Sequence, residues 1–186
     1  MSDAGLLVRA PLVTDAPRLA EVNVETWRRA YDGIVPTTYL EALDVETARR
    51  RWLGRIGEPG DRVCLVAEIE GVVAAYAVGG PYRTQQDAEP ETTTGWAELY
   101  AIYAHPDLQD KGAGSAVHDC LLDALAERGF TLAALWVLRD NIRTTRWYRE
   151  RGWRPDGAVS QWLGAGDPLE EHRLARSLGD RPSVVL

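Results

Sequence analysis

The segment from Gln109 to Gly114 reads QDKGAG and combines two glycines and a lysine directly before an apolar helical pattern. Glycine lets the main chain come close to a ligand, and the unpaired amides that open a helix favour negative charge. We therefore interpret this segment as a site for a phosphate or diphosphate. It has neither the GxxxxGK[ST] order of a Walker loop nor the G-x-G-x-x-G dinucleotide fingerprint. The alternative is a glycine-rich turn that only changes the direction of the chain.

The cysteines, the histidines and the net charge argue against metal binding and against nucleic-acid binding. Cys64 and Cys120 show no CxxC pairing and have no His at metal-ligand spacing, and three scattered histidines form no metal motif. We therefore expect no metal, and two buried thiols in a reducing compartment. The formal net charge of −7 argues against nucleic acid as a partner. This charge favours a cationic acceptor, or it simply keeps the protein in solution.

The composition is that of a folded globular protein, with 45% apolar and 26% charged residues. No apolar run reaches the ~20 residues that a membrane-spanning helix needs. Residues 1–10 contain no basic patch followed by an apolar stretch. We therefore expect no secretory signal, no membrane partner and a cytoplasmic location.

The hydrophobic pattern predicts one domain in which strands and helices follow a mixed α/β order. Its clearest helix starts near Gly112, where apolar residues recur at helical spacing, with His118 among the residues of the other side and Gly129 at its end. Strands are expected at residues 6–10, 63–69, 72–78, 96–104, 132–138, 159–163 and 169–174. The other predicted elements are helices from Thr14 or Asp15 to about Tyr31, at 39–56 and at 142–151, and a polar loop at 81–95.

Residues 98–117, reading ELYAIYAHPDLQDKGAGSAV, resemble the acetyl-CoA motif of the GNAT superfamily of N-acetyltransferases. That motif is a strand, often ending in a His-Pro or similar corner, followed by Q/R-x-x-G-x-G/A at the start of a helix. A second family feature follows: a strand, Asn141, a short helix that carries Tyr148, and an aromatic residue after a glycine. The first motif is matched completely at Gln109, Gly112 and Gly114.

This resemblance implies both a fold and a reaction. The fold would be α/β (α+β), a single GNAT-type domain over residues 1–186 with its core motifs at 96–153. It would have a central mixed, mostly antiparallel twisted sheet of about six to seven strands, with helices on both faces. The reaction would move the acetyl group of acetyl-CoA to a primary amine of a small molecule or peptide, without a metal. A homodimer is also compatible with the resemblance, because homodimers are common in the family.

The resemblance assigns site residues one by one. The amides from Gln109 to Ser115 would cradle the coenzyme diphosphate, and the main chain from Ile102 to Ala104 would pair with the pantetheine arm where two strands splay apart. Asn141 would hold the pantetheine or the adjacent backbone, and Tyr148 would lie near the thioester sulfur. The expected coenzyme-binding residues are Ile102, Tyr103, Ala104, Gln109, Asp110, Lys111, Gly112, Ala113, Gly114, Ser115, Asn141 and Tyr148.

The implied chemistry needs a neutral attacking amine, a stabilised oxyanion and a proton for the leaving thiolate. We assign proton donation to Tyr148, because a phenol with the ordinary pKa of ~10 stays protonated at neutral pH. We assign the base to Glu98, because histone-type members carry a catalytic Glu at the same offset from Gln109. A core aromatic at position 148, a structural carboxylate at 98 and a water relay without a single base are the alternatives. Residues 135–138 contain no carboxylate, unlike relatives that acetylate protein N-termini.

Aromatic residues in the N-terminal part, Trp27 and Tyr31 together with Tyr39, are expected to line the acceptor pocket, because aromatic faces bind cations. Simple packing of a helix against the sheet is the alternative. Two other functions stay open: a catalytically silent acyl-CoA-binding or sensor module of the same fold, and an unrelated ATP-binding protein. Acidic residues of the polar loop could also attract a cationic acceptor: Asp87, Glu89 and Glu91.

Overall fold

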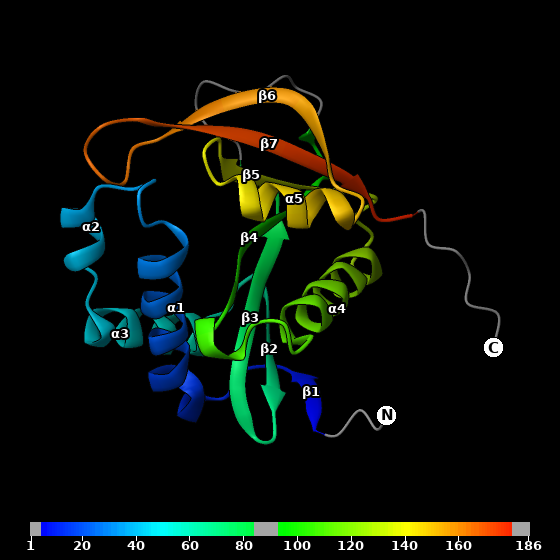
Figure 1. Cartoon of the computed structure of the whole chain (residues 1–186). Helices are drawn as coiled ribbons and strands as arrows, with labels where there is room; N and C mark the ends of the chain where they lie inside the picture. Colours follow the sequence, from blue (N-terminus) through cyan, green and yellow to red (C-terminus); the bar gives the residue numbers. More distant parts are fainter. Residues whose placement is uncertain (1–4, 84–92, 180–186) are drawn as a thin grey trace.

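The computed structural model describes residues 5–83 and 93–179, which fold around one seven-stranded sheet (Figure 1). The strands lie in the order β1-β2-β3-β4-β5-β7-β6. Among the described strands, only β4 and β5 pair in parallel, which confirms the predicted mixed, mostly antiparallel sheet. The strands are β1 (Leu6–Arg9), β2 (Val63–Ile69), β3 (Val72–Pro81), β4 (Ala97–Ala104), β5 (Leu132–Leu138), β6 (Arg154–Trp162) and β7 (Leu169–Ser177).

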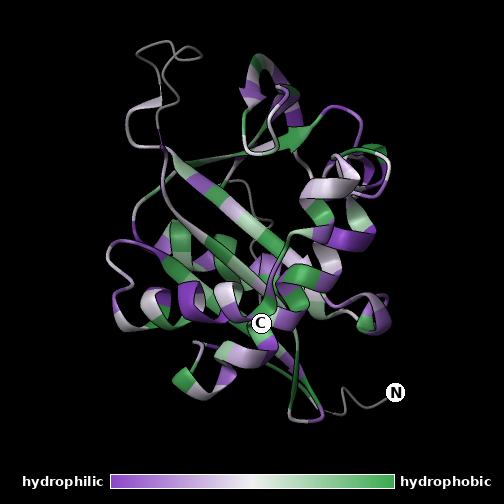
Figure 2. Cartoon of the chain, turned by 90° about the vertical axis from the view of Figure 1, so that its left-hand side faces the viewer, coloured by the Kyte–Doolittle hydropathy of each residue, from purple (hydrophilic) through white to green (hydrophobic). Residues whose placement is uncertain are grey.

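Helices cover both faces of this sheet, as predicted. α4 and α5 pack on one face, whereas α1 and α3 pack on the other (Figure 1). Gly79 in β3 lets α4 come close, because a Cβ added there would lie 3.2 Å from the side chain of Leu121. Helices carry both hydrophilic and hydrophobic colours in Figure 2, as expected for helices with one buried face. The helices are α1 (Ala16–Ala30), α2 (Thr37–Glu41), α3 (Val45–Gly57), α4 (Ala113–Glu127) and α5 (Ile142–Glu150).

The prediction of a single helix over residues 39–56 is wrong, because the chain breaks between α2 and α3. Asp44 has extended backbone angles, and its side chain accepts a hydrogen bond from the amide of Thr47 at 2.8 Å. An aspartate that caps the next helix in this way ends helical continuity at its own position. The two shorter helices can therefore turn against α1, which places α2 beside its C-terminal end (Figure 1).

His118 also differs from expectation, because it is fully buried in α4 instead of lying on the solvent side. The reason is a partner outside the helix: the indole of Trp153 donates a hydrogen bond to His118 Nε2 at 3.0 Å. A buried imidazole with both nitrogens paired is tolerated in a core. The two cysteines, Cys64 and Cys120, are free thiols that are partly buried.

The strands β4 and β5 part soon after they meet. Their ladder contains two pairs, Ala97 with Ala133 and Glu98 with Ala134, and no further pair among the described residues. On its other edge β4 stays paired with β3 as far as Ala104, with a register shift after Val78. The later half of β4 therefore has one bonded edge and one edge that faces the space between the strands.

Two further properties concern the described part of the chain. None of its helices has the length and apolar character needed to cross a membrane. Nor do three or more His, Cys, Asp or Glu side chains come together there in a way that could hold a metal ion. The acidic residues considered in the polar loop, Asp87, Glu89 and Glu91, lie outside the described residues.

Candidate active site

The glycine-rich segment forms a tight turn that opens α4. Gln109 is extended, Asp110 and Gly112 have positive φ angles of 64° and 85°, and the helix begins at Ala113. At Gly112 this left-handed backbone favours a residue without a side chain. At Gly114 a side chain would point toward β4, since an added Cβ would lie 3.8 Å from that of Ala104. The start of α4 therefore lies beside Ala104, the last residue of β4, and the assignment of its amides to a diphosphate stays a prediction.

The expected pantetheine-binding strand lies next to this turn. Ile102 and Tyr103 pair with β3 through Ala77 and Tyr76, so their ladder partners are on the side away from β5. The carbonyl of Ala104 accepts from the side chain of Gln109 at 3.3 Å. The end of the strand and the start of the turn are therefore held together as one rigid corner.

Helix α5 brings two arginines to the turn that sequence reasoning missed. Arg143 donates to the side-chain oxygen of Gln109 at 3.2 Å, and Arg151 donates to the hydroxyl of Ser115 at 2.7 Å. The Arg151 guanidinium also lies 3.8 Å from the centre of the Trp147 ring. Two cations beside a helix N-terminus reinforce its preference for an anion. The arginine-rich composition of residues 142–151 is the signal that could have identified them.

Asn141 and Tyr148 lie at the start and near the end of α5. The Asn141 side chain caps the helix by accepting from the amide of Thr144 at 3.3 Å. Tyr148 is buried, with its ring 6.0 Å from that of Trp153. Burial raises the pKa of the Tyr148 phenol well above its ordinary value, and the nearby Tyr31 adds to the rise. The phenol is therefore protonated at neutral pH.

Phenols from opposite faces of the sheet approach each other at the gap between β4 and β5. The hydroxyls of Tyr31, which follows α1, and Tyr103 on β4 are 3.4 Å apart. Tyr31 is close enough to Tyr148 on the far side to influence its pKa, as Tyr148 does that of Tyr103. A continuous ladder between β4 and β5 would separate these side chains. The divergence of the two strands thus brings the predicted coenzyme side and the predicted acceptor side together.

The predicted acceptor residues form an aromatic cluster on the α1 side. The Trp27 ring centre lies 4.5 Å from that of Tyr31 and 6.0 Å from that of Tyr39. Trp162 at the end of β6 lies 5.8 Å from Trp27 and was missed, because no local pattern connects residues so far apart. The aromatic cluster consists of Trp27, Tyr31, Tyr39, Tyr103 and Trp162.

Glu98, the predicted base, is 1% exposed at the point where β4 and β5 diverge. Its Oε2 accepts from the backbone amide of Arg83 at 3.0 Å and from Nε at 3.1 Å, and its Oε1 pairs with Nη2 of the same residue. The guanidinium of Arg83 lies over the Tyr100 ring at 4.1 Å. Glu98 is thus a buried carboxylate neutralised by one arginine, and its assignment as the base stays a prediction.

Two more polar residues near the gap come from β5 and β7 and were not predicted. Glu171 of β7 lies opposite Leu138 of β5 and is partly buried. Burial, and to a lesser degree the charge of Glu98, raise the pKa of its carboxyl to about 7 against an opposing effect of Arg83. The Nε1 of Trp136 is buried without a hydrogen-bond partner in the described structure.

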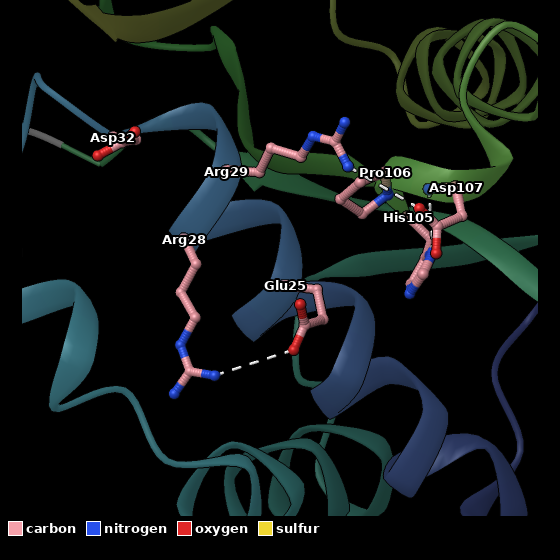
Figure 3. A pocket seen from close by; sticks show the side chains of 7 residues that line it. All are labelled: Glu25, Arg28, Arg29, Asp32, His105, Pro106 and Asp107. Atoms are coloured by element: carbon pink, nitrogen blue, oxygen red, sulfur yellow. Dashed lines mark hydrogen bonds and ion pairs between the residues drawn. The ribbon is translucent and has the colours of Figure 1, made fainter.

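Two cavities border these elements. The larger, about 330 Å³, lies between α1 and the corner after β4, and two ion pairs lie within it: Arg28 with Glu25 at 3.9 Å and Arg29 with Asp107 at 3.8 Å (Figure 3). His105 at its edge is a turn residue, because its Nδ1 accepts from the amide of Asp107. The smaller, about 230 Å³, is lined in part by Ile34, Leu138 and Leu169, which pack against the aromatic cluster. The smaller cavity is therefore the one that adjoins the predicted acceptor side.

Residues 24–153 match the profile of the acetyltransferase (GNAT) family. The chain is 31% identical over 134 residues to the uncharacterized N-acetyltransferase YuaI of Bacillus subtilis (strain 168), covering 72% of each chain. It is 26% identical over 111 residues to phosphinothricin N-acetyltransferase of Streptomyces viridochromogenes, covering 59% of this chain and 57% of that one. The solved PaiA N-acetyltransferase of Thermoplasma acidophilum in complex with coenzyme A has the same fold, with a TM-score of 0.72, 20% identity, and coverage of 95% of this chain and 99% of that one.

Proposed function

This chain belongs to the acetyltransferase (GNAT) family, and we propose that it transfers the acetyl group of acetyl-CoA to a primary amine of a small molecule or peptide by direct attack in a ternary complex. The observation that carries this proposal is the divergence of β4 from β5 beside the glycine-rich start of α4. An open strand edge next to a helix N-terminus suits a ligand with an amide-containing arm and a diphosphate end.

The chain's own residues fit such a cosubstrate. The amides from Gln109 to Ser115 would hold the diphosphate, with Arg143, Arg151 and Lys111 supplying positive charge. The open edge of Ile102–Ala104 would pair with the pantetheine arm as an added strand does. Asn141 would contribute mainly by capping α5 and so fixing Tyr148. The proposed binding surface is thus continuous from the turn to the gap.

In the proposed reaction the neutral amine attacks the thioester carbonyl, and the two reactants gain rate from being held together. Tyr148 then gives its proton to the departing thiolate. Burial makes this phenol a weaker acid than usual, but the thiolate leaves into the same desolvated gap, which raises its pKa as well. The two pKa values therefore move in the same direction, and proton transfer between the groups is retained.

The acceptor is proposed to enter from the α1 side, beside Trp27 and Tyr31 of the aromatic cluster. The relative from Streptomyces viridochromogenes is named for N-acetylation of phosphinothricin, which supports an amine-bearing acceptor for this chain. The location in the cytoplasm and a homodimer stay predictions.

The proposal is tested by incubating the full chain with acetyl-CoA and a panel of amines and measuring the release of free thiol. We expect at least one amine to be acetylated, and acetyl-CoA to bind in calorimetry whereas ATP does not. Coenzyme binding without turnover of any amine would instead favour the silent acyl-CoA-binding module. Binding of ATP in preference to acetyl-CoA would overturn both.

A further inference from the structure

Glu171 occupies a position between two groups of side chains on the α1 face of the sheet. Residues alternate along β7, so Leu169, Glu171 and Arg173 share one face. Leu169 packs against the aromatic cluster, and the Arg173 guanidinium lies 5.6 Å from the centre of the Trp136 ring. Glu171 itself lies opposite Leu138, the last residue of β5. A carboxylate at this place borders the aromatic cluster and the gap where β4 and β5 diverge.

The negative charge of Glu171 is less well compensated by nearby cations than the negative charge of Glu98. Glu98 is bound to Arg83 through both carboxylate oxygens. For Glu171, burial and the charge of Glu98 outweigh the attraction of Arg83 and raise its carboxyl pKa to about 7. A carboxylate with a well-placed cation would instead have a lowered pKa. Glu171 therefore lacks full charge compensation in the protein alone, and a cationic ligand would supply it.

Other charged and titratable groups around Glu171 are already engaged with one another. Tyr31, the residue after α1, shares a hydrogen bond with Tyr103, and the charge of Glu171 contributes to the raised pKa of its phenol. Arg173, on the same face of β7, donates to Asp156 at 2.7 Å and to the hydroxyl of Tyr82 at 3.0 Å. On the opposite face of β7, His172 and Glu170 bond to each other at 2.9 Å.

A second observation also indicates a ligand at this place. Trp136 lies diagonal to Glu171 across the β5–β7 ladder, since Trp136 pairs with Arg173 and Leu138 pairs with Glu171. The indole N–H of Trp136 is buried without a hydrogen-bond partner in the described structure. A buried donor is normally paired, and a hydrogen-bond acceptor on a ligand bound beside Trp136 would supply the missing partner.

We propose that Glu171 binds the ammonium group of the acceptor and takes the proton that the amine must lose before it attacks. This inference rests on the proposed acetyl transfer and specifies the acceptor as a cationic amine that carries an apolar body for the aromatic cluster and an oxygen or other hydrogen-bond acceptor for Trp136.

The proton and electron balance of this step is complete. The ammonium gives one proton to the Glu171 carboxylate, and the free amine donates its electron pair to the thioester carbonyl carbon. The C–N bond forms and the C–S bond breaks, so the thiolate leaves with the bonding pair and takes the phenolic proton of Tyr148. The second proton of the attacking nitrogen restores the Tyr148 phenol, and the Glu171 carboxylic acid releases its proton to water.

The test compares Glu171→Gln with the control Glu127→Gln, which alters an exposed carboxylate at the C-terminal end of α4 that lines neither cavity. The probes are tyramine and its 4-methoxy analogue, which carry an aromatic ring and an oxygen and whose amines stay protonated between about pH 5.5 and 8. We expect kcat/KM of the wild type to decrease toward acid pH with an apparent pKa of about 7, and we call this decrease the acid limb. At pH 8, kcat/KM of Glu171→Gln should be about 100-fold lower than that of the wild type. The acid limb should also be absent from this variant. Glu127→Gln should keep both.

Two further variants separate a role in proton transfer from a role in folding. Glu171→Asp, which keeps a carboxylate, should retain the acid limb at a reduced rate. Glu98→Gln removes the charge that raises the Glu171 pKa, so its acid limb should move to lower pH. Coenzyme A affinity, measured by calorimetry, should change by less than about twofold in all variants. An unchanged rate and unchanged acid limb in folded Glu171→Gln would overturn the inference.

Binding of the same amines to the protein–coenzyme A complex distinguishes failure of this inference from failure of the proposed function. We expect Glu171→Gln to weaken that binding at least about tenfold. If amines bind through Glu171 but release no thiol from acetyl-CoA, acetyl transfer to these amines is overturned while the ammonium site stands. If no amine binds the wild type, or if binding is independent of Glu171, the inference is wrong even where acetyl transfer occurs.

Discussion

The indole N–H of Trp153 donates a hydrogen bond to Nε2 of His118 at 3.0 Å, in the core between α4 and α5. Nδ1 of the same imidazole lies 2.7 Å from a carboxylate oxygen of Asp119. Because Nε2 is the acceptor, the neutral ring carries its proton on Nδ1 and donates it to Asp119. The Trp153 ring also lies 6.0 Å from that of Tyr148. This bond therefore links the helix proposed to bind coenzyme to the residue proposed to donate the proton.

Protonation of His118 should weaken the fold. Burial lowers the pKa of His118, and Asp119 opposes that effect only in part. The unfolded chain then binds the proton more readily, so stability falls as pH decreases below the ordinary histidine pKa of ~6.5. We expect the free energy of unfolding to fall more steeply between about pH 7.5 and 5.5 in the wild type than in His118→Gln. Urea unfolding at several pH values measures this, and equal slopes would contradict it.

A side chain at Gly114 should block the coenzyme. An added Cβ would have room beside Ala104, at 3.8 Å, so Gly114→Glu should fold while placing a negative charge in the proposed diphosphate site. We expect calorimetry to detect no acetyl-CoA binding by this variant. The control is Gly54→Glu on the exposed surface of α3, where no atom lies within 4 Å of an added Cβ. Normal binding by folded Gly114→Glu would refute the placement of the diphosphate.

The two arginines at the turn should contribute to coenzyme affinity. Arg143→Ala and Arg151→Ala each remove a cation held at Gln109 or Ser115, and we expect each to raise the dissociation constant of acetyl-CoA about tenfold. Added salt should weaken wild-type binding more than binding by the variants. Arg149→Ala on the exposed side of α5 is the control. Equal affinities for all three variants would assign the arginines to packing alone.

Replacement of the Tyr148 hydroxyl should affect the rate more than binding. Tyr148→Phe keeps the buried ring and its contact with Trp153 but removes the proton donor. We expect kcat to fall about 100-fold with the acetyl-CoA affinity kept within about twofold. Thiol release and calorimetry on the same preparation measure both quantities. A silent coenzyme-binding module would show binding by both forms and no turnover by either.

The stability of the fold should depend on the ion pair between the buried Glu98 carboxylate and Arg83. The Glu98 side chain is 2% exposed and that of Arg83 is 61% exposed, so water can partly replace the arginine. We expect Arg83→Met to lower the free energy of unfolding by about 2 kcal/mol, because a buried carboxylate loses its partner. The double variant with Glu98→Gln should recover part of this loss. Additive effects in the double-mutant cycle would show that the pair is not coupled.

Much of the fold could be predicted from the sequence, because its signals are local. Short apolar runs predicted a strand that overlaps each of the seven described strands, although β6 begins at Arg154, five residues before the predicted start, and the spacing from Gly112 to Gly129 predicted α4. The break between α2 and α3 was missed although Asp44 and Thr47 stand at capping distance. A single capping bond competes with a longer helical pattern, and periodicity alone does not decide between them.

The candidate site likewise combines features with a local sequence signal and features that depend on the folded chain. The family motif could be recognised from local sequence, from Gln109 to Gly114 and from Asn141 to Tyr148, because a turn and the helix that follows it are specified by neighbouring residues. The separation of β4 from β5 after two pairs, and the positions of Glu171, Trp136 and Arg83 near the resulting gap, follow instead from how the strands pair in the folded chain. These residues come from separate strands and loops, and their side chains become neighbours through strand pairing. The carboxyl pKa of Glu171 likewise depends on burial and on Glu98 of another strand, neither of which is a property of local sequence.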